Sequence, residues 1–339
     1  MVMKIKIMAG LIIINIASQA QIKYCTYWTA PTLSSENAEK LSKDNLVIID
    51  YENLINNPEE VSQIKKSQPS LKLLVYSNPM EVWEKEMLNR NIANDFLSTL
   101  PSAYRLKRTD DKPVIFWKGM EMMNISSKCP KINGKNYVDY YSDWILSKIL
   151  SNTLIDGYFI DNGTSTISWV DPKIDADNNK CADPPKALDN WWREGMIDFI
   201  QKIRKEKGDD FIIVTNKGET AFFFINNGVM FEKFPNDYLG GKIDYGWHQS
   251  MKNAGKARPY TIFQVDFSNL EFGLASSLLL DNVYIAVGQN MSIPDKYRIN
   301  TGKPLNKAYL KNHLYYREFE NVMVEVNPAK KTGKITKKN

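Results

Sequence analysis

The sequence is poor in the residues on which several common kinds of site depend. It has two histidines, His248 and His313, and three cysteines among 339 residues. So few histidines argue against a histidine-rich catalytic zinc site, and the cysteine spacing supports no structural one. Three cysteines also exclude a small disulfide scaffold. We expect Cys25, in an apolar stretch, to be a buried thiol, and a Cys129–Cys181 disulfide stays open.

Nucleotide-binding and serine-hydrolase motifs are missing too. The sequence has no G-x-G-x-x-G, no G-x-x-x-x-G-K-[ST] and no G-x-S-x-G. Its 43% hydrophobic and 24% charged residues are typical of a globular protein and exclude a disordered chain, a collagen or a coiled coil. We expect no bound cofactor and no metal.

Long apolar runs are absent after the N-terminus. Ile7–Ile16 is an apolar run broken by Asn15, preceded by two lysines and followed by Ser18 and Ala20. This order of charge, apolar run and small residues predicts a signal peptide over residues 1–20, cleaved before Gln21, and a secreted or periplasmic protein. A buried first strand or helix is the alternative. No later segment is long enough to span a membrane.

An excess of positive charge is also missing from the body of the chain. The formal charge is +5, but seven lysines lie in the first six and last ten residues: Lys4, Lys6, Lys330, Lys331, Lys334, Lys337 and Lys338. The remainder is slightly acidic, so we expect no nucleic-acid partner.

What the sequence does contain is a regular alternation of short apolar runs and helix-like segments. Most of the runs are continuous rather than alternating, as in parallel strands buried on both faces. Eight such β-then-α units predict a (β/α)₈ TIM barrel. The expected strands are Lys23–Thr29, Leu46–Asp50, Leu71–Ser77, Gly157–Asp161, Phe211–Thr215, Val229–Glu232, Tyr260–Val265 and Val283–Val287.

Two segments exceed a minimal barrel. Pro79–Leu154 is too long for one crossover and predicts an excursion after the third strand, and Trp169–Pro185 predicts a long loop after the fourth. After the eighth strand, Tyr315–Val326 predicts one extra β-strand. We expect the barrel domain to cover residues 21–328, followed by a lysine-rich disordered tail over 329–339.

Two carboxylates stand at the ends of predicted strands. Asp161 closes the run Gly157–Ile160, and Glu232 closes Val229–Phe231. In a barrel, such residues point into the catalytic mouth. The structural alternatives are that Asp161 shapes its turn and that Glu232 pairs with Lys233. A pair of carboxyl groups, one ionised and one protonated, is what glycoside hydrolysis requires.

Aromatic and polar residues near other strand ends suit a ligand rich in hydroxyl groups, because indole rings stack on the C–H faces of sugars. Aromatic residues that merely fill the core, and ordinary loop residues, are the alternatives. The expected substrate-binding residues are Trp28, Asp50, Tyr76, Asn78, Asn162, Trp169, Asn216, Lys217, Asp266 and Gln289.

One acidic loop resembles the start of a calcium loop. Asp175, Asp177 and Asn179 follow the D-x-D-x-N pattern. The sixth position is Lys180 rather than glycine, and the twelfth is Lys186 rather than an acidic residue, so we do not expect calcium there.

A set of ordered motifs resembles the hypothetical glycosyl hydrolases of bacterial exported proteins, TIM-barrel relatives of the endo-α-1,4-polygalactosaminidases. The motifs span Leu74 to Pro328: Leu74–Pro79, Asp156–Asn162, Ile174–Asp177, Trp192–Met196, Thr215–Gly218, Met230–Phe234, Arg317–Asn321 and Val326–Pro328. The resemblance implies a barrel with its active site at the strand ends. By analogy with related α-glycosidase barrels it implies Asp161 as nucleophile and Glu232 as acid/base.

The sequence therefore predicts a monomeric, exported glycoside hydrolase acting on an α-linked poly- or oligosaccharide. A carbohydrate-binding barrel without turnover is the first alternative, and an unrelated barrel enzyme or surface scaffold is the second.

Overall fold

A computed structural model describes residues 22–218, 220–235, 246–256 and 259–338. The predicted signal peptide lies outside these residues. Within them, no helix is both long and apolar enough to cross a membrane.

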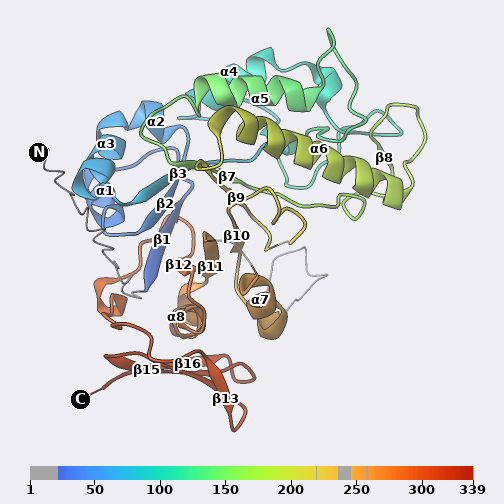
Figure 1. Cartoon of the computed structure of the whole chain (residues 1–339). Coiled ribbons are helices and arrows are strands. Elements are labelled where there is room, and N and C mark those ends of the chain that lie inside the picture. Colours follow the sequence, from blue (N-terminus) through green and yellow to red (C-terminus); the bar gives the residue numbers. More distant parts are fainter. Residues whose placement is uncertain (1–21, 219, 236–245, 257–258, 339) are drawn as a thin grey trace, which may run out of the picture.

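Eight parallel strands close into a barrel, as predicted (Figure 1). Around the barrel the order is β1, β12, β11, β10, β9, β7, β3, β2. The strands are β1 (Lys23–Trp28), β2 (Leu46–Asp50), β3 (Lys72–Ser77), β7 (Gly157–Ile160), β9 (Ile212–Thr215), β10 (Gly228–Phe231), β11 (Thr261–Val265) and β12 (Val283–Val287). Each predicted strand matches an observed one to within a residue at either end.

The continuous apolar runs arise because each strand is covered on both faces. In β2, Leu46 and Ile48 belong to the cluster inside the barrel, whereas Val47 and Ile49 belong to the cluster under the surrounding helices. Every residue of β2 is buried, so no polar alternation appears in the sequence.

Helices follow most of the strands. They are α1 (Ser35–Leu41), α2 (Asn53–Asn56), α3 (Pro58–Ser67), α4 (Asn91–Thr99), α5 (Tyr137–Lys148), α6 (Pro185–Lys207), α7 (Gly246–Ala254) and α8 (Leu270–Leu278). The described residues depart from eight complete units in two places: they contain no helix between β9 and β10, and after β12 they contain only a 3-10 turn (Asp295–Tyr297) before the C-terminal sheet.

The predicted excursion after β3 is present and carries its own short strands. β4 (Glu81–Trp83) pairs with β6 (Met120–Met122). β5 (Lys107–Arg108) pairs with β8 (Ile174–Asp175), which belongs to the long loop after β7. The side chain of Asn124 also donates a 2.7 Å hydrogen bond to the carbonyl of Ala176. The two insertions are therefore joined into one body beside the barrel mouth.

Helix α6 is seated against this body by a glycine. A Cβ at Gly195 would lie 1.6 Å from the carbonyl oxygen of Ile125, so no side chain fits there. Trp192, one turn earlier, is fully buried and donates from its indole nitrogen to the carbonyl of Thr164.

The C-terminal region corrects two predictions. In place of one extra strand over Tyr315–Val326, an antiparallel sheet contains β13 (Tyr309–Lys311), β14 (Leu314–Glu318), β15 (Val322–Asn327) and β16 (Thr332–Lys337). The predicted disordered tail is wrong, because β16 pairs with β15 along its whole length. This pairing also places the domain boundary expected at 328 inside the sheet.

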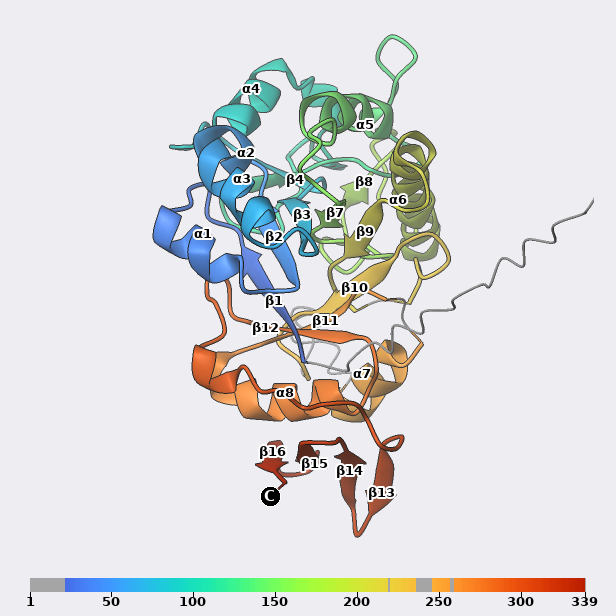
Figure 2. The same cartoon turned by 60° about the vertical axis from the view of Figure 1, so that its left-hand side comes forward.

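The sheet lies beneath α8, at the opposite end of the molecule from α4 and α5 (Figures 1 and 2). Val322, Val324 and Val326 are buried on its inner face, and a Cβ at Gly333 would lie 2.5 Å from the Cβ of Ala275 on α8. Within β16, Lys334 is exposed between the half-buried Gly333 and Ile335, and Lys337 is exposed at the end of the strand, so a lysine-rich composition is compatible with an edge strand.

All three cysteines are free thiols. Cys25 is buried, as predicted, Cys129 is also buried and Cys181 is exposed, so the disulfide left open by the sequence does not form here.

Candidate active site

A cleft of about 810 Å³ opens at the carboxyl ends of the barrel strands. Its walls come from the strand ends and from the excursion after β3. Of the predicted site residues, it brings together Asp161, Glu232, Asp50, Tyr76, Asn78, Asn162, Lys217, Asp266 and Gln289.

Asp161 follows β7 directly and is held by three donors. Its Oδ1 accepts hydrogen bonds from the Asn162 backbone (2.8 Å) and from Nδ2 of Asn216 (2.8 Å). Its Oδ2 accepts one from the Tyr76 hydroxyl at 2.7 Å. Burial, reinforced by the Asp161 charge, raises the pKa of Tyr76, which keeps that hydroxyl protonated as a donor. Oδ2 therefore accepts one hydrogen bond and keeps a second lone pair as a possible nucleophile.

Glu232 follows β10 and shares a donor with Asp161. Nδ2 of Asn216 lies 3.1 Å from Glu232 Oε2 and 2.8 Å from Asp161 Oδ1. The two N–H bonds of an amide nitrogen diverge by about 120°, and with that ideal geometry two acceptors at these distances would be about 5 Å apart. The Lys217 backbone N–H donates to Oδ1 of Asn216 at 2.8 Å, which turns the amide nitrogen toward the carboxylates. Asn216 thus contributes from behind the cleft rather than lining it.

Lys217 is a buried cation at the end of the neighbouring strand. Its Nζ lies 3.5 Å from Glu232 Oε2, and only 3% of its side chain is exposed. Lys217 has a φ of 90°, Lys233 has 54° and Asn162 has 50°. Left-handed backbone at non-glycine residues is uncommon and concentrates at functional sites, and here it follows three neighbouring strands.

Glu81 is a cleft residue that sequence reasoning missed. It begins β4, is 3% exposed and lines the same cleft as Asp161. Burial raises the pKa of Glu81 to about 7, against the opposing effect of hydrogen bonds from Asn78 and the Trp117 backbone. The sequence offers little signal for it, because a lone glutamate in a long excursion resembles a surface residue.

Asp50 lies in the cleft wall as half of a buried ion pair. Its Oδ2 accepts a 2.8 Å hydrogen bond from Arg90 Nη1, and its side chain is 1% exposed. Burial raises the pKa of Asp50 and the Arg90 charge opposes that rise. Glu52 accepts from the backbone N–H groups of Ile92 and Ala93 at the start of α4. These contacts anchor the excursion to the end of β2.

The two tryptophans predicted to bind sugar are not part of the cleft wall. Trp28 is buried and donates to the carbonyl of Thr32. Trp169 packs edge-to-face on Phe116 beside a separate, much smaller cavity. The cleft is lined instead by Trp83 and Trp117 of the excursion, with Trp117 41% exposed. Nearness to a strand end in sequence was misleading, because the pairing of β4 with β6 brings residues of the excursion into the cleft wall instead.

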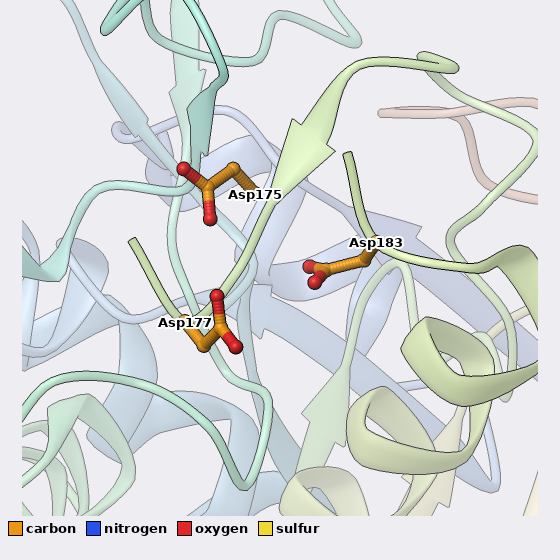
Figure 3. Close-up of side chains that lie close together, drawn as sticks. All are labelled: Asp175, Asp177 and Asp183. Atoms are coloured by element: carbon orange, nitrogen blue, oxygen red, sulfur yellow. The ribbon is translucent and has the colours of Figure 1, made fainter. Parts of the chain in front are cut away.

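The acidic loop after β8 brings three carboxylates together. Oxygens of Asp175, Asp177 and Asp183 lie within 4.8 Å of one another, and their carboxyl groups converge in Figure 3. Asp175 accepts from the backbone of Asn179 and Lys180, and Asp183 accepts from that of Ala176. These hydrogen bonds hold the loop closed. The cluster of carboxylates is therefore explained by its role in anchoring the loop.

Comparison with known proteins agrees with this architecture. The model of hypothetical glycosyl hydrolase family 15 matches residues 65–323. Among curated proteins, none matches the chain. Among solved structures, the chain is similar to a noncanonic maltogenic α-amylase from Thermotoga neapolitana, at 10% identity and a TM-score of 0.52, over 91% of this chain and 86% of that one.

Two further structures share the barrel. The GH31 dextranase of Flavobacterium johnsoniae matches 82% of this chain and 37% of its own, at 10% identity and a TM-score of 0.52. The α-N-acetylgalactosaminidase of Bifidobacterium bifidum matches 94% and 58%, at 8% identity and a TM-score of 0.51. At such low identity these likenesses establish the fold. The family model covers most of the chain, and the protein therefore belongs to hypothetical glycosyl hydrolase family 15 as a glycoside hydrolase.

Proposed function

We propose that the protein is a retaining hydrolase of α-linked poly- or oligosaccharides, with Asp161 as nucleophile and Glu232 as acid/base. The observation that carries the proposal is the donor that the two carboxyl groups share, Nδ2 of Asn216, whose ideal geometry corresponds to a separation of about 5 Å between the bonded oxygens. Retaining glycosidases hold the pair about 5–5.5 Å apart, whereas inverting ones leave about 6.5–9.5 Å for a water.

In the first step, Asp161 Oδ2 attacks the anomeric carbon with its free lone pair and forms a glycosyl ester. The bond from that carbon to the glycosidic oxygen breaks, and Glu232 gives its proton to the departing oxygen. The Lys217 ammonium, 3.5 Å from Glu232, stabilises the carboxylate that results.

In the second step, the Glu232 carboxylate takes a proton from water. The hydroxide attacks the anomeric carbon, and the ester bond to Asp161 breaks. Tyr76 and Asn216 hold Asp161 in one orientation through both steps. The product has the anomeric configuration of the substrate because the carbon is inverted twice.

The choice of α-linked substrates is supported by the barrel relatives, among which are a maltogenic α-amylase and an α-N-acetylgalactosaminidase. The exposed indole of Trp117 in the cleft suits a sugar face. We also propose export of the protein, on the basis of the charge and apolar pattern of residues 1–20.

The test is product release from a panel of α- and β-linked glycans, measured as new reducing ends. We expect hydrolysis of at least one α-linked glycan and a loss of about 10³-fold or more in Asp161→Asn. Asp143→Asn is the matched control, because Asp143 is exposed on α5 and pairs with Lys135. Glycan binding with no product from wild type would favour the non-catalytic barrel, and wild-type activity in Asp161→Asn would remove Asp161 from the chemistry.

A further inference from the structure

Among the described residues of the cleft, Glu81 is a strongly buried carboxyl that accepts hydrogen bonds from three separate segments. Its Oε2 accepts from Nδ2 of Asn78 (2.9 Å) and Nδ2 of Asn162 (2.7 Å), and its Oε1 from the Trp117 backbone N–H (3.2 Å). The three donors belong to the end of β3, the turn after β7 and the loop before β6. Glu81 is therefore the point at which the excursion meets the barrel rim.

The Asn162 contact leads directly to the nucleophile of the proposed mechanism. Asn162 holds a left-handed backbone, with φ of 50°, and its N–H donates to Oδ1 of Asp161 at 2.8 Å. A non-glycine residue with this backbone conformation needs support from its surroundings. The bond to Glu81 supplies such support, because it fixes the Asn162 amide while its backbone orients Asp161.

The Trp117 contact leads to the opposite wall. Trp117 is 41% exposed and lines the cleft, and its backbone position is set by the bond to Glu81. One carboxylate thus fixes both the turn that carries Asp161 and the loop that carries an aromatic platform.

We propose that Glu81 is a positioning residue, which sets the spacing between Asp161 and the Trp117 loop by accepting these three hydrogen bonds. The role assigned to Asp161 rests on the proposed function. The clamp itself consists of hydrogen bonds in the structure and does not depend on the proposed function.

The clamp is strongest with the ionised carboxylate. Hydrogen bonds to a charged acceptor are about twice as strong as those to a neutral one, so protonation of Glu81 weakens its bonds to Asn78, Asn162 and Trp117. The charged groups that act on Glu81 are Asp161, after β7, which raises its pKa, and Lys217, after β9, which lowers it. With the pKa of Glu81 at about 7, the clamp becomes stronger as the pH rises through neutrality.

The kinetic test compares Glu81→Gln with Glu121→Gln. A glutamine has one acceptor oxygen where three donors converge, so Glu81→Gln loses at least one bond while keeping the shape of the side chain. Glu121 lies on β6, the strand that pairs with β4. Its side chain pairs with Arg105 and does not line the cleft, so Glu121→Gln is a matched carboxyl-to-amide change.

We expect kcat of wild type to rise between pH 6 and 8 with a midpoint near 7. We expect Glu81→Gln to show a flat kcat at least about tenfold below the wild-type plateau, and Glu121→Gln to behave as wild type. Circular dichroism confirms that the variants are folded. A wild-type kcat in Glu81→Gln, or an unchanged pH dependence, would overturn the proposal.

A second readout does not depend on activity. The difference between the fluorescence of wild type and Trp117→Phe isolates the Trp117 indole. We expect this difference to titrate near pH 7, and the same difference measured in the Glu81→Gln background to be flat. Titration in both backgrounds, or in neither, would contradict the clamp. If wild type hydrolyses no glycan, the proposed function fails while this titration still decides the role of Glu81.

Discussion

The carboxyl groups of Asp161 and Glu232 both accept a hydrogen bond from one nitrogen atom, Nδ2 of Asn216, at 2.8 and 3.1 Å. Asn216, which holds both carboxyl groups, directly follows β9. In the barrel, β9 lies between β7 and β10, the strands that Asp161 and Glu232 follow. The spacing of the pair is thus determined by the barrel rather than by flexible loops, and its stereochemical consequence can be measured.

Replacement of Glu232 by alanine tests the acid/base role. Without this residue no group deprotonates water in the second step, so the glycosyl ester on Asp161 accumulates with substrates whose leaving group needs no acid. We expect azide, which needs no deprotonation, to restore turnover and give a glycosyl azide of retained configuration, seen by NMR. An azide product of inverted configuration would contradict the acid/base role of Glu232. So would azide rescue of Asp161→Ala without rescue of Glu232→Ala.

Removal of the Trp117 indole tests the aromatic wall. We expect Trp117→Ala to raise KM about tenfold, equivalent to about 1.4 kcal/mol, with a smaller change in kcat. Trp191→Ala is the control, because Trp191 lies on α6 and faces Lys128 outside the cleft. Equal KM values for the two variants would indicate that Trp117 does not contact substrate.

The contact between α6 and the excursion predicts a large effect from one methyl group. In Gly195→Ala the new Cβ would meet the Ile125 carbonyl at 1.6 Å, so the helix or the excursion must shift. We expect the free energy of unfolding to fall by about 1–3 kcal/mol or more, measured by urea denaturation. At Gly255 the nearest atom lies 3.3 Å from the new Cβ, so Gly255→Ala is expected to change stability by less than about 1 kcal/mol.

Glu81 also makes stability depend on pH. Its pKa is raised by burial from the ordinary 4.5 to about 7, so the folded state keeps a proton that the unfolded chain has lost in this range. The stabilising contribution is complete below pH 4.5 and is lost as the pH rises to 7, by at most about 3.4 kcal/mol. We expect Glu81→Gln to remove this loss, measured as unfolding free energy at pH 5 and pH 8. The same decline in Glu81→Gln as in wild type would assign it to other groups.

The barrel could be predicted because burial on both faces leaves a direct trace in the sequence. All five residues of β2 and of β12 are buried, and each run is uninterrupted. Asp161 and Glu232 could be proposed as site residues for a related reason: each is the first carboxylate after such a run.

Other parts of the site could not be read in this way. Glu81 belongs to a three-residue strand whose position depends on the pairing of β4 with β6, and no local pattern encodes that fold-back. Trp28 and Trp169 lie near strand ends in sequence, yet their indole nitrogens bond to nearby backbone carbonyls instead of facing the cleft. The pairing of the tail could not be predicted from its lysine content, because the inward contacts of β16 come from only two residues, Gly333 against α8 and Ile335 against the sheet core.

The pairing of β5 with β8 has a consequence for protein engineering. The two strands are contributed by different loops, and each supplies the backbone partner that the other would otherwise lack. Grafting either loop alone onto another barrel would leave an unpaired edge, so the unit to transplant is the pair. A change of substrate range by loop exchange therefore has to treat residues 79–154 and 163–184 as a single cassette.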